Sequence, residues 1–169
     1  MRESRHPASD VEGHVPALRR YALGLIGRES PDPAACADEM VRQTVERARR
    51  KGQLGAFHDP HIWLYATLTT CNRARNAAQK PRPDPQRPPA PGVAEGLGRL
   101  ALEDREALLL VVIEGFTYAQ AASILGLTRQ GVASRVARAR QLMTERPQAQ
   151  HRAASPLRPR HPPYLRLVK

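Results

Sequence analysis

The sequence is poor in aromatic residues and cysteine, and it lacks any long apolar run. Only 4% of its residues are Phe, Trp or Tyr, which is few for one large hydrophobic core. The longest apolar run, residues 107–113, is far shorter than the roughly 20 residues that a membrane-spanning helix needs. The charged N-terminus has no apolar stretch, so neither a membrane span nor a secretory signal is expected. Two cysteines, Cys36 and Cys71, make no disulfide framework, which favours a reducing cytoplasm.

Residue patterns that would indicate an enzyme are also missing. Residues 96–98 read Gly-Leu-Gly without a preceding strand or a third glycine, so they predict no dinucleotide site. His58, Asp59 and His61 lie near one another in sequence, but with Cys36 and Cys71 they have no recognised zinc spacing. Buried thiols are the simpler interpretation. We expect no catalytic residues, no metal, no cofactor and no small-molecule substrate.

Positive charge is abundant and concentrated at the C-terminal end. The chain has 27 Lys and Arg against 16 Asp and Glu, a formal net charge of +11. Residues 94–126 carry a net −3, whereas residues 127–169 carry a net +9. So sharp an increase in net charge near residue 127 favours a nucleic-acid-binding element over a surface that is merely basic.

Proline clusters divide the chain. Six prolines fall within residues 81–91, and a second cluster lies in a basic tail without acidic residues. Proline lacks an amide proton and disfavours helix in the residue before it. We therefore predict a tail over 1–14, a helical domain over 15–80, a linker over 81–93, a second helical domain over 94–146 and a disordered basic tail over 147–169. Because the linker should prevent one continuous core, each domain is expected to have its own.

Helical periodicity runs through both domains, which predicts an all-α fold. A first helix over residues 15–25 should end at Gly27, and a third should begin at Asp59 and Pro60. The second has apolar residues at helical spacing, namely Ala37, Met40, Val41, Thr44, Val45 and Ala48.

The second domain contains a helix-turn-helix pattern. A helix over 103–113 should end at Gly115, and Thr117 and Gln120 form a capping box for the next helix. That helix should stop at Gly126, after which Thr128 caps a last, arginine-rich helix. Val132 and Val136 should face inward. The N-terminal end of such a helix enters the major groove of DNA.

Residues 116–140 resemble region 4 of bacterial sigma-70 family factors, and most closely the small extracytoplasmic-function (ECF) group. Residues 16–22, 37–44 and 63–65 resemble region 2 of the same family, in the order and with the linker that the family requires. The resemblance implies two small helical domains, like sigma regions 2 and 4, joined by the proline-rich linker. It also implies promoter DNA, core RNA polymerase and an anti-sigma factor as partners. The expected place of action is the cytoplasmic nucleoid, with the anti-sigma factor as a possible membrane tether.

The resemblance assigns three sets of binding residues. For the −35 element these are Thr128, Arg129, Gln130, Ala133, Ser134, Arg135, Arg138 and Arg140. For the −10 element they are Phe57, Trp63, Tyr65, Thr69, Thr70, Arg73 and Arg75. For core polymerase they are Asp38, Glu39, Val41, Arg42 and Gln43.

Several positions depart from the family pattern, mainly in the region 2-like part. Arg42-Gln43 replaces a Gln followed by an acid, and Thr69-Thr70 replaces an Arg-Asn pair. The recognition helix has Gln130-Gly131-Val132-Ala133 where Gly-Thr-Val-Lys is usual. Two alternatives to promoter recognition therefore stay open: a sigma-like protein that titrates an anti-sigma factor, and a stand-alone helix-turn-helix regulator. Trp63 is equally well explained as a core residue, and Arg73 and Arg75 as solvated side chains.

Overall fold

The fold is all helical throughout the part of the chain that the structure, a computed structural model, describes. It describes residues 11–27, 30–51, 59–78 and 92–144, and every regular element in these ranges is a helix. None of these helices is long and apolar enough to cross a membrane. The predicted all-α class is confirmed, whereas Phe57, most of the proline-rich linker and the basic tail lie outside the described residues.

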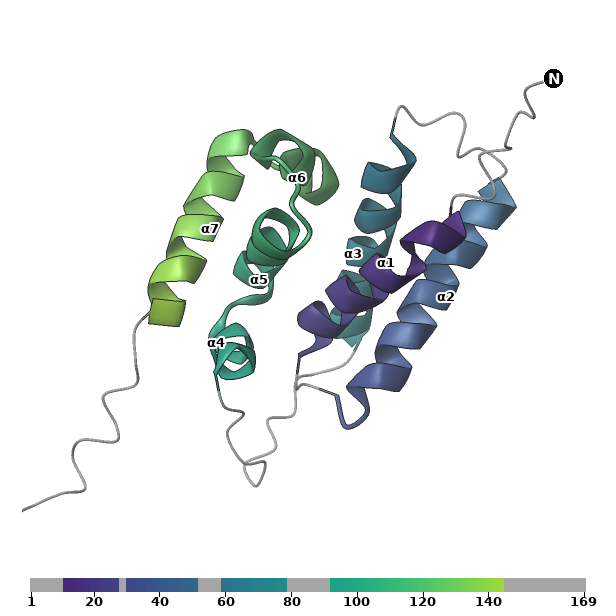
Figure 1. The fold of residues 1–169 in the computed structure, drawn as a ribbon, viewed down its shortest axis with the longest axis horizontal. Coiled ribbons are helices and arrows are strands. Elements are labelled where there is room, and N and C mark those ends of the chain that lie inside the picture. The colour runs from purple at the N-terminus through teal and green to yellow at the C-terminus, as the bar shows by residue number, and fades with distance from the viewer. Residues whose placement is uncertain (1–10, 28–29, 52–58, 79–91, 145–169) are drawn as a thin grey trace, which may run out of the picture.

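Three helices, α1 (Val11–Ile26), α2 (Pro33–Lys51) and α3 (Pro60–Ala78), form an N-terminal bundle (Figure 1). Helix α1 begins four residues before the predicted domain, because Val11 is buried and belongs to its apolar face. It ends where predicted, at Gly27, whose φ of 54° suits glycine. Asp32 and Asp59 begin the other two helices, since their carboxylates accept hydrogen bonds from first-turn amides.

The C-terminal bundle consists of α4 (Val93–Arg99), α5 (Leu102–Leu108), η3 (Leu109–Ile113), α6 (Tyr118–Leu125) and α7 (Arg129–Thr144). The helix predicted over 103–113 is present, but its last five residues widen into a π-helical turn. The capping box of Thr117 and Gln120 is confirmed, and Gly126 adopts the left-handed conformation at the end of α6. Val132 and Val136 are buried, as predicted.

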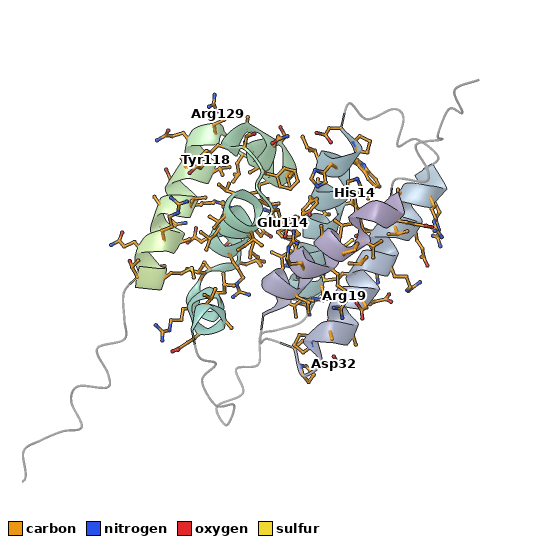
Figure 2. All side chains as sticks on the ribbon, viewed as in Figure 1. His14, Arg19, Asp32, Glu114, Tyr118 and Arg129 are labelled. Carbon is orange, nitrogen blue, oxygen red and sulfur yellow. The ribbon has the colours of Figure 1, made fainter. Side chains whose placement is uncertain are left out.

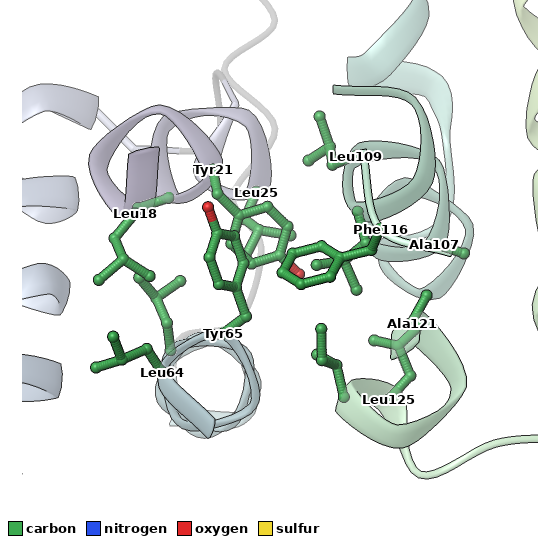
Figure 3. Packing of buried hydrophobic residues seen from close by; sticks show 14 of the residues in the cluster. Leu18, Tyr21, Leu25, Leu64, Tyr65, Ala107, Leu109, Phe116, Ala121 and Leu125 are labelled. Carbon is green, nitrogen blue, oxygen red and sulfur yellow. The ribbon is translucent and has the colours of Figure 1, made fainter. Parts of the chain in front are cut away.

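The two bundles share one hydrophobic core, so the expectation of separate cores is wrong. Helices α1 and α3 pack against α5, η3 and α6, as Figures 1 and 3 show. Tyr65 of α3 and Phe116, just before α6, make an edge contact with ring centroids 4.8 Å apart. A proline-rich linker prevents a continuous helix, but it does not prevent the units on either side from docking.

A stack of rings lies along this contact. The ring of His61 is 4.9 Å from that of His14, 4.7 Å from that of Phe116 and 5.0 Å from that of Tyr65, between centroids. Burial, together with the neighbouring His14, lowers the pKa of His61 below its ordinary value. Asp59 and Glu114 oppose this shift. Protonation of His61 is therefore disfavoured in the folded protein.

The capping box predicts a measurable effect on stability. Thr117→Ala removes the oxygen that accepts the hydrogen bond from the amide of Gln120. We expect the free energy of unfolding to fall by about 0.5–2 kcal/mol, the usual cost of losing an N-cap. Urea denaturation followed by circular dichroism measures it. The matched control is Thr70→Ala, because the exposed hydroxyl of Thr70 bonds only to a carbonyl of its own helix. Equal losses in the two variants would contradict this role for Thr117.

The lowered pKa of His61 predicts a pH dependence of stability. Between that lowered pKa and the ordinary value near 6.5, the unfolded chain binds more protons than the folded chain. The contribution of His61 to stability is thus present above pH 6.5 and is lost as the pH falls below it. We expect His61→Phe, which keeps an aromatic ring, to flatten the decline in unfolding free energy from about pH 7.5 to about pH 5.5. An unchanged decline in this variant would show that other groups cause it.

Candidate nucleic-acid interface

Helices α6 and α7 form a helix-turn-helix whose turn is built by local hydrogen bonds. The left-handed Gly126 lets the amide of Leu127 donate to the carbonyl of Ala122 at 2.9 Å. The hydroxyl of Thr128 then accepts from the amide of Gly131 at 3.0 Å, which caps α7. These contacts direct the N-terminus of α7 outward from the bundle, where Figure 2 shows Arg129.

The residues predicted for the −35 element fall into two groups. Thr128, Arg129, Gln130, Ser134 and Arg140 are exposed, and Ala133 is half-buried beside them. The exposed side chains at the start of α7 include an arginine and a glutamine, side-chain types that are able to bind base edges in a major groove. This group forms a surface that is free to meet a ligand.

The second group is two arginines of α7 that make or lie close to contacts with the rest of the bundle. The guanidinium of Arg138 donates to both carboxylate oxygens of Asp104, at 2.7 Å and 2.5 Å. The side chain of Asp104 is only 2% exposed, so this pair stabilises the bundle as well as displaying charge. Arg135 is half-buried, and its Nη1 is buried without a hydrogen-bond partner. Arg138 is thus ion-paired but still 60% exposed, whereas Arg135 is partly withdrawn from solvent.

The residues predicted for the −10 element differ more widely in how exposed they are. Tyr65 and Thr69 are buried, Thr70 is exposed, and Trp63 and Arg75 are half-buried. The Tyr65 hydroxyl donates to Glu114 at 2.7 Å, and Thr69 shares a 3.0 Å hydrogen bond with the hydroxyl of Tyr21. Burial raises the pKa of Tyr65, with a further contribution from Glu114. In this arrangement neither Tyr65 nor Thr69 is accessible to a nucleotide.

Arg73 also turns toward the C-terminal bundle. Its guanidinium binds Glu106 of α5 with a shortest distance of 2.6 Å. The Glu106 side chain has no exposed surface, and burial raises its pKa while Arg73 opposes that shift. A buried carboxylate of this kind needs a cationic partner. The predicted phosphate contact by Arg73 therefore competes with a contact inside the molecule.

One part of the predicted −10 surface remains open. A groove of about 460 Å³ lies between α2 and α3, and its lining includes Trp63, Thr70, Arg47 and Arg50. The Arg47 guanidinium also contacts the Cys71 thiol at 2.8 Å. The two arginines were not among the residues assigned to DNA, although the cluster of cations at the end of α2 was visible in the sequence.

The residues assigned to core polymerase all lie on α2, where the charged ones form a network that also includes Arg19 of α1. Asp38 pairs with Arg19 at 2.5 Å, and Glu39 accepts from both Arg42 and Gln43 at 2.7 Å. The hydrogen bonds from Arg42 and Gln43 lower the pKa of Glu39 to about 2. Val41 differs from the rest of the set, because it is buried in the core.

No metal site is formed by the described residues, among which no three His, Cys, Asp or Glu side chains come together. Cys36 and Cys71 are both free thiols. Cys36 lies beside the hydroxyl of Ser30 at 3.1 Å.

Sequence reasoning missed the acidic residues that join the two bundles. Glu106 binds Arg73, and Glu114 binds both Arg20 and Tyr65. The sequence did show that this segment is acidic, because residues 94–126 have a net charge of −3 and lie between two basic segments. The partners of these acids lie 33 to 94 residues away, so sequence spacing could not identify them.

Comparisons with known proteins match both bundles to sigma factors. Residues 93–143 match the family model "Sigma-70, region 4", and residues 11–69 match "Sigma2 domain of PhyR". The structure is similar to the sigma factor RpoE of Bartonella quintana, solved with the anti-sigma factor NepR. That match has a TM-score of 0.62 and 24% identity, and it covers 80% of this chain and 92% of that one. It is also similar to PhyRSL of Sphingomonas sp. Fr1, solved with NepR. There the TM-score is 0.60 at 27% identity, over 95% and 98% of the two chains.

A curated relative identifies the group within the family. The ECF RNA polymerase sigma factor EcfG of Rhodopseudomonas palustris (strain TIE-1) is 30% identical over 152 residues, which cover 78% of this chain and 79% of the relative. The predicted region 2 and region 4 likenesses are thus confirmed, with the refinement that the N-terminal bundle matches the sigma2 domain of PhyR. With both bundles matched in the family order, the chain belongs to the ECF group of the sigma-70 family.

Proposed function

We propose that this protein directs core RNA polymerase to specific promoters, with α6 and α7 reading the −35 element and α3 engaging the −10 element. The exposed N-terminal turn of α7 supports this proposal most directly. It follows a turn that is fixed by local hydrogen bonds, and it presents Arg129 and Gln130 to solvent. Sigma factors act by binding and are not enzymes. The partners of this function are promoter DNA and core polymerase, and its place of action is the nucleoid.

The start of α7 has side chains suited to base readout. Arginine pairs with guanine through two hydrogen bonds, and glutamine pairs with adenine in the same way. Arg140 lies farther along the helix and is exposed, which suits a phosphate contact that positions the protein. We therefore assign base contacts to Arg129 and Gln130 and backbone contacts to Arg140.

The groove beside Trp63 supports a contact with unpaired DNA. Aromatic rings stack on any base, with a contribution of about 1–3 kcal/mol per base. Arg47 and Arg50 on the opposite wall supply positive charge for the backbone. Thr70, exposed on the same groove, adds a hydroxyl.

The charged network of α1 and α2 is the proposed core-polymerase surface. Asp38, Glu39 and Arg42 are exposed side by side, and their ion pairs hold them in fixed positions. Exposed pairs of this kind add little to stability. Their proposed contribution is to recognition of a protein partner with matching charges.

Titration of an anti-sigma factor is a second candidate function. One observation favours it: the N-terminal bundle matches the sigma2 domain of PhyR, and PhyR of Bartonella quintana is described as an anti-anti-sigma factor complexed with NepR. A chain with this function would bind an anti-sigma factor of the NepR kind without initiating transcription. An anti-sigma factor is a proposed partner under either function.

Run-off transcription separates the two candidates. We expect purified core polymerase to make promoter-dependent transcripts from genomic fragments only when this chain is added. The reason is that both DNA-reading surfaces and the core-binding surface lie on one molecule. An absence of transcripts, combined with tight binding to a NepR-like protein in a pull-down, would favour the second function instead.

The assignment of base contacts predicts the effect of Gln130→Ala. We expect it to weaken binding to a cognate −35 duplex by about 1–3 kcal/mol while leaving binding to a scrambled duplex nearly unchanged. Gel-shift titration on the two duplexes measures the difference. Gln141→Ala is the matched control, since it makes the same change on an exposed position near the other end of α7. If both variants weakened cognate binding equally, Gln130 would not be a reading residue.

A further inference from the structure

A cavity of about 450 Å³ lies between α2 and α3, and both cysteines of the chain line it. Cys36 comes from the start of α2, and Cys71 comes from α3. Asp32, which Figure 2 labels just before α2, is also part of the lining. The volume of this cavity is within the range of cavities that bind small molecules, roughly 300–1,000 Å³.

The two thiols differ in accessibility. Cys71 has 6% of its surface exposed, and the guanidinium of Arg47 already contacts its sulfur at 2.8 Å. Cys36 is half-buried, and its sulfur lies 3.1 Å from the hydroxyl of the buried Ser30. A hydroxyl at this distance is able to donate a hydrogen bond to the sulfur and hold it in position. Cys36 is therefore the thiol that a reagent in the cavity can reach.

The cavity wall also presents charges of both signs. In the described part of the chain, the hydrogen bonds of Arg75 go to the amide oxygens of Asn72 and Asn76, and its Nε is buried without a partner. Asp32 is exposed, and its carboxylate accepts a hydrogen bond from the amide of Ala35. A guanidinium suits a carboxylate, and a carboxylate suits an ammonium group. A small peptide with both groups and a thiol therefore matches this cavity in charge.

We propose that Cys36 is a site of reversible thiolation by a small peptide thiol of the glutathione class, and that the adduct weakens binding to core RNA polymerase. Cys36 loses its proton to solvent, and its sulfur anion attacks the disulfide of the oxidised peptide. A mixed disulfide forms, the S–S bond of the peptide breaks, and one half leaves as a thiolate that takes up a proton. The bound half places a carboxylate at Arg75 and its ammonium group at Asp32. A small thiol removes the adduct by the reverse exchange.

The adduct lies next to the proposed core-polymerase surface. Glu39 and Gln43 line the same cavity, and both belong to the charged network of α2. Cys36, Glu39 and Gln43 share one side of the helix, because they are three and four residues apart in turn. A peptide with a net negative charge at Cys36 adds bulk and like charge beside Glu39. This effect on polymerase rests on the proposed function, whereas the thiolation itself does not.

Mass spectrometry of the intact full chain maps the adduct. We expect oxidised glutathione to add one glutathione to the native wild type, and dithiothreitol to remove it. Cys36→Ser should take up none, whereas Cys71→Ser, the matched control, should react like the wild type. The chain has only two cysteines, so no other thiol competes. The wild type unfolded in urea should take up two, because both thiols are then accessible.

Arg75→Gln tests the charge of the cavity wall. We expect this variant to react with oxidised glutathione about two- to fivefold more slowly than the wild type, the effect of losing one solvent-accessible ion pair. Its rate with bis(2-hydroxyethyl) disulfide, which carries no charge, should match the wild-type rate. Unfolding of the variant would instead raise both rates, so the two reagents separate an effect of charge from an effect of stability.

Binding to purified core RNA polymerase, followed by biolayer interferometry, provides the functional readout. We expect the glutathione adduct of the wild type to bind at least about tenfold more weakly than the reduced protein, because like charges placed together across an interface are strongly unfavourable. Dithiothreitol should restore the affinity. Cys36→Ser treated in the same way is the control, and its affinity should not change.

Three outcomes would overturn the proposal. An adduct on Cys71, or on neither cysteine of the native chain, would show that Cys36 is not the site. Equal effects of Arg75→Gln on the two reagents would show that the cavity does not select a charged peptide. An adduct that binds core polymerase as tightly as the reduced protein would show that thiolation does not regulate binding. If the reduced wild type did not bind core polymerase at all, the proposed function would fail, whereas the mass measurement would still decide the thiolation site.

Discussion

The contact between the α1/α3 face and the C-terminal bundle is the constraint on which the rest of the arrangement depends. With few aromatic residues in the chain, several of them meet at this contact, where Tyr21, Tyr65 and Phe116 lie against one another. Two small bundles with modest cores gain apolar burial by docking. The same contact determines which predicted binding residues are covered and which remain open.

Charge is arranged to serve both docking and DNA binding. The acidic stretch between the two basic segments does more than offset positive charge, because Asp104, Glu106 and Glu114 each bind a particular arginine. Arg138 and Arg73, both assigned to DNA from the sequence, thereby form ion pairs within the folded chain while remaining 60% and 42% exposed. Among the described residues, exposed positive charge includes Arg129 at the start of α7 and Arg47 and Arg50 toward the end of α2.

The helix-turn-helix differs from the α3 face in how it is built. Its turn depends on Gly126, Thr117 and Thr128, all within a few residues of the groups they position. Its reading end points away from the contact between the bundles. The residues predicted for the −35 element are thus mostly exposed, whereas Tyr65 and Thr69, predicted for the −10 element, are covered by the contact between the bundles.

Local chemistry made most of the helices predictable. Capping residues, glycine stops and apolar periodicity act over one or two turns, so the ends of α6 and the inward faces of α2 and α7 were predicted correctly. The π-helical turn at Leu109–Ile113 was not, because a run of apolar residues has no periodicity that separates it from an ordinary helix. The start of α1 was placed late because the burial of Val11 depends on its neighbours in the bundle.

The predicted binding residues differ in whether their exposure could be predicted from the sequence. The sequence by itself determined the helix-turn-helix and the exposed character of Arg129 and Gln130, since both follow from short-range caps and helical spacing. Only the tertiary structure decided that Tyr65 and Thr69 are covered and that Arg73 faces Glu106. Those contacts join residues more than 30 positions apart across a proline-rich linker. The physical reason is that docking of two preformed surfaces depends on their shape and charge in space, which no local pattern encodes.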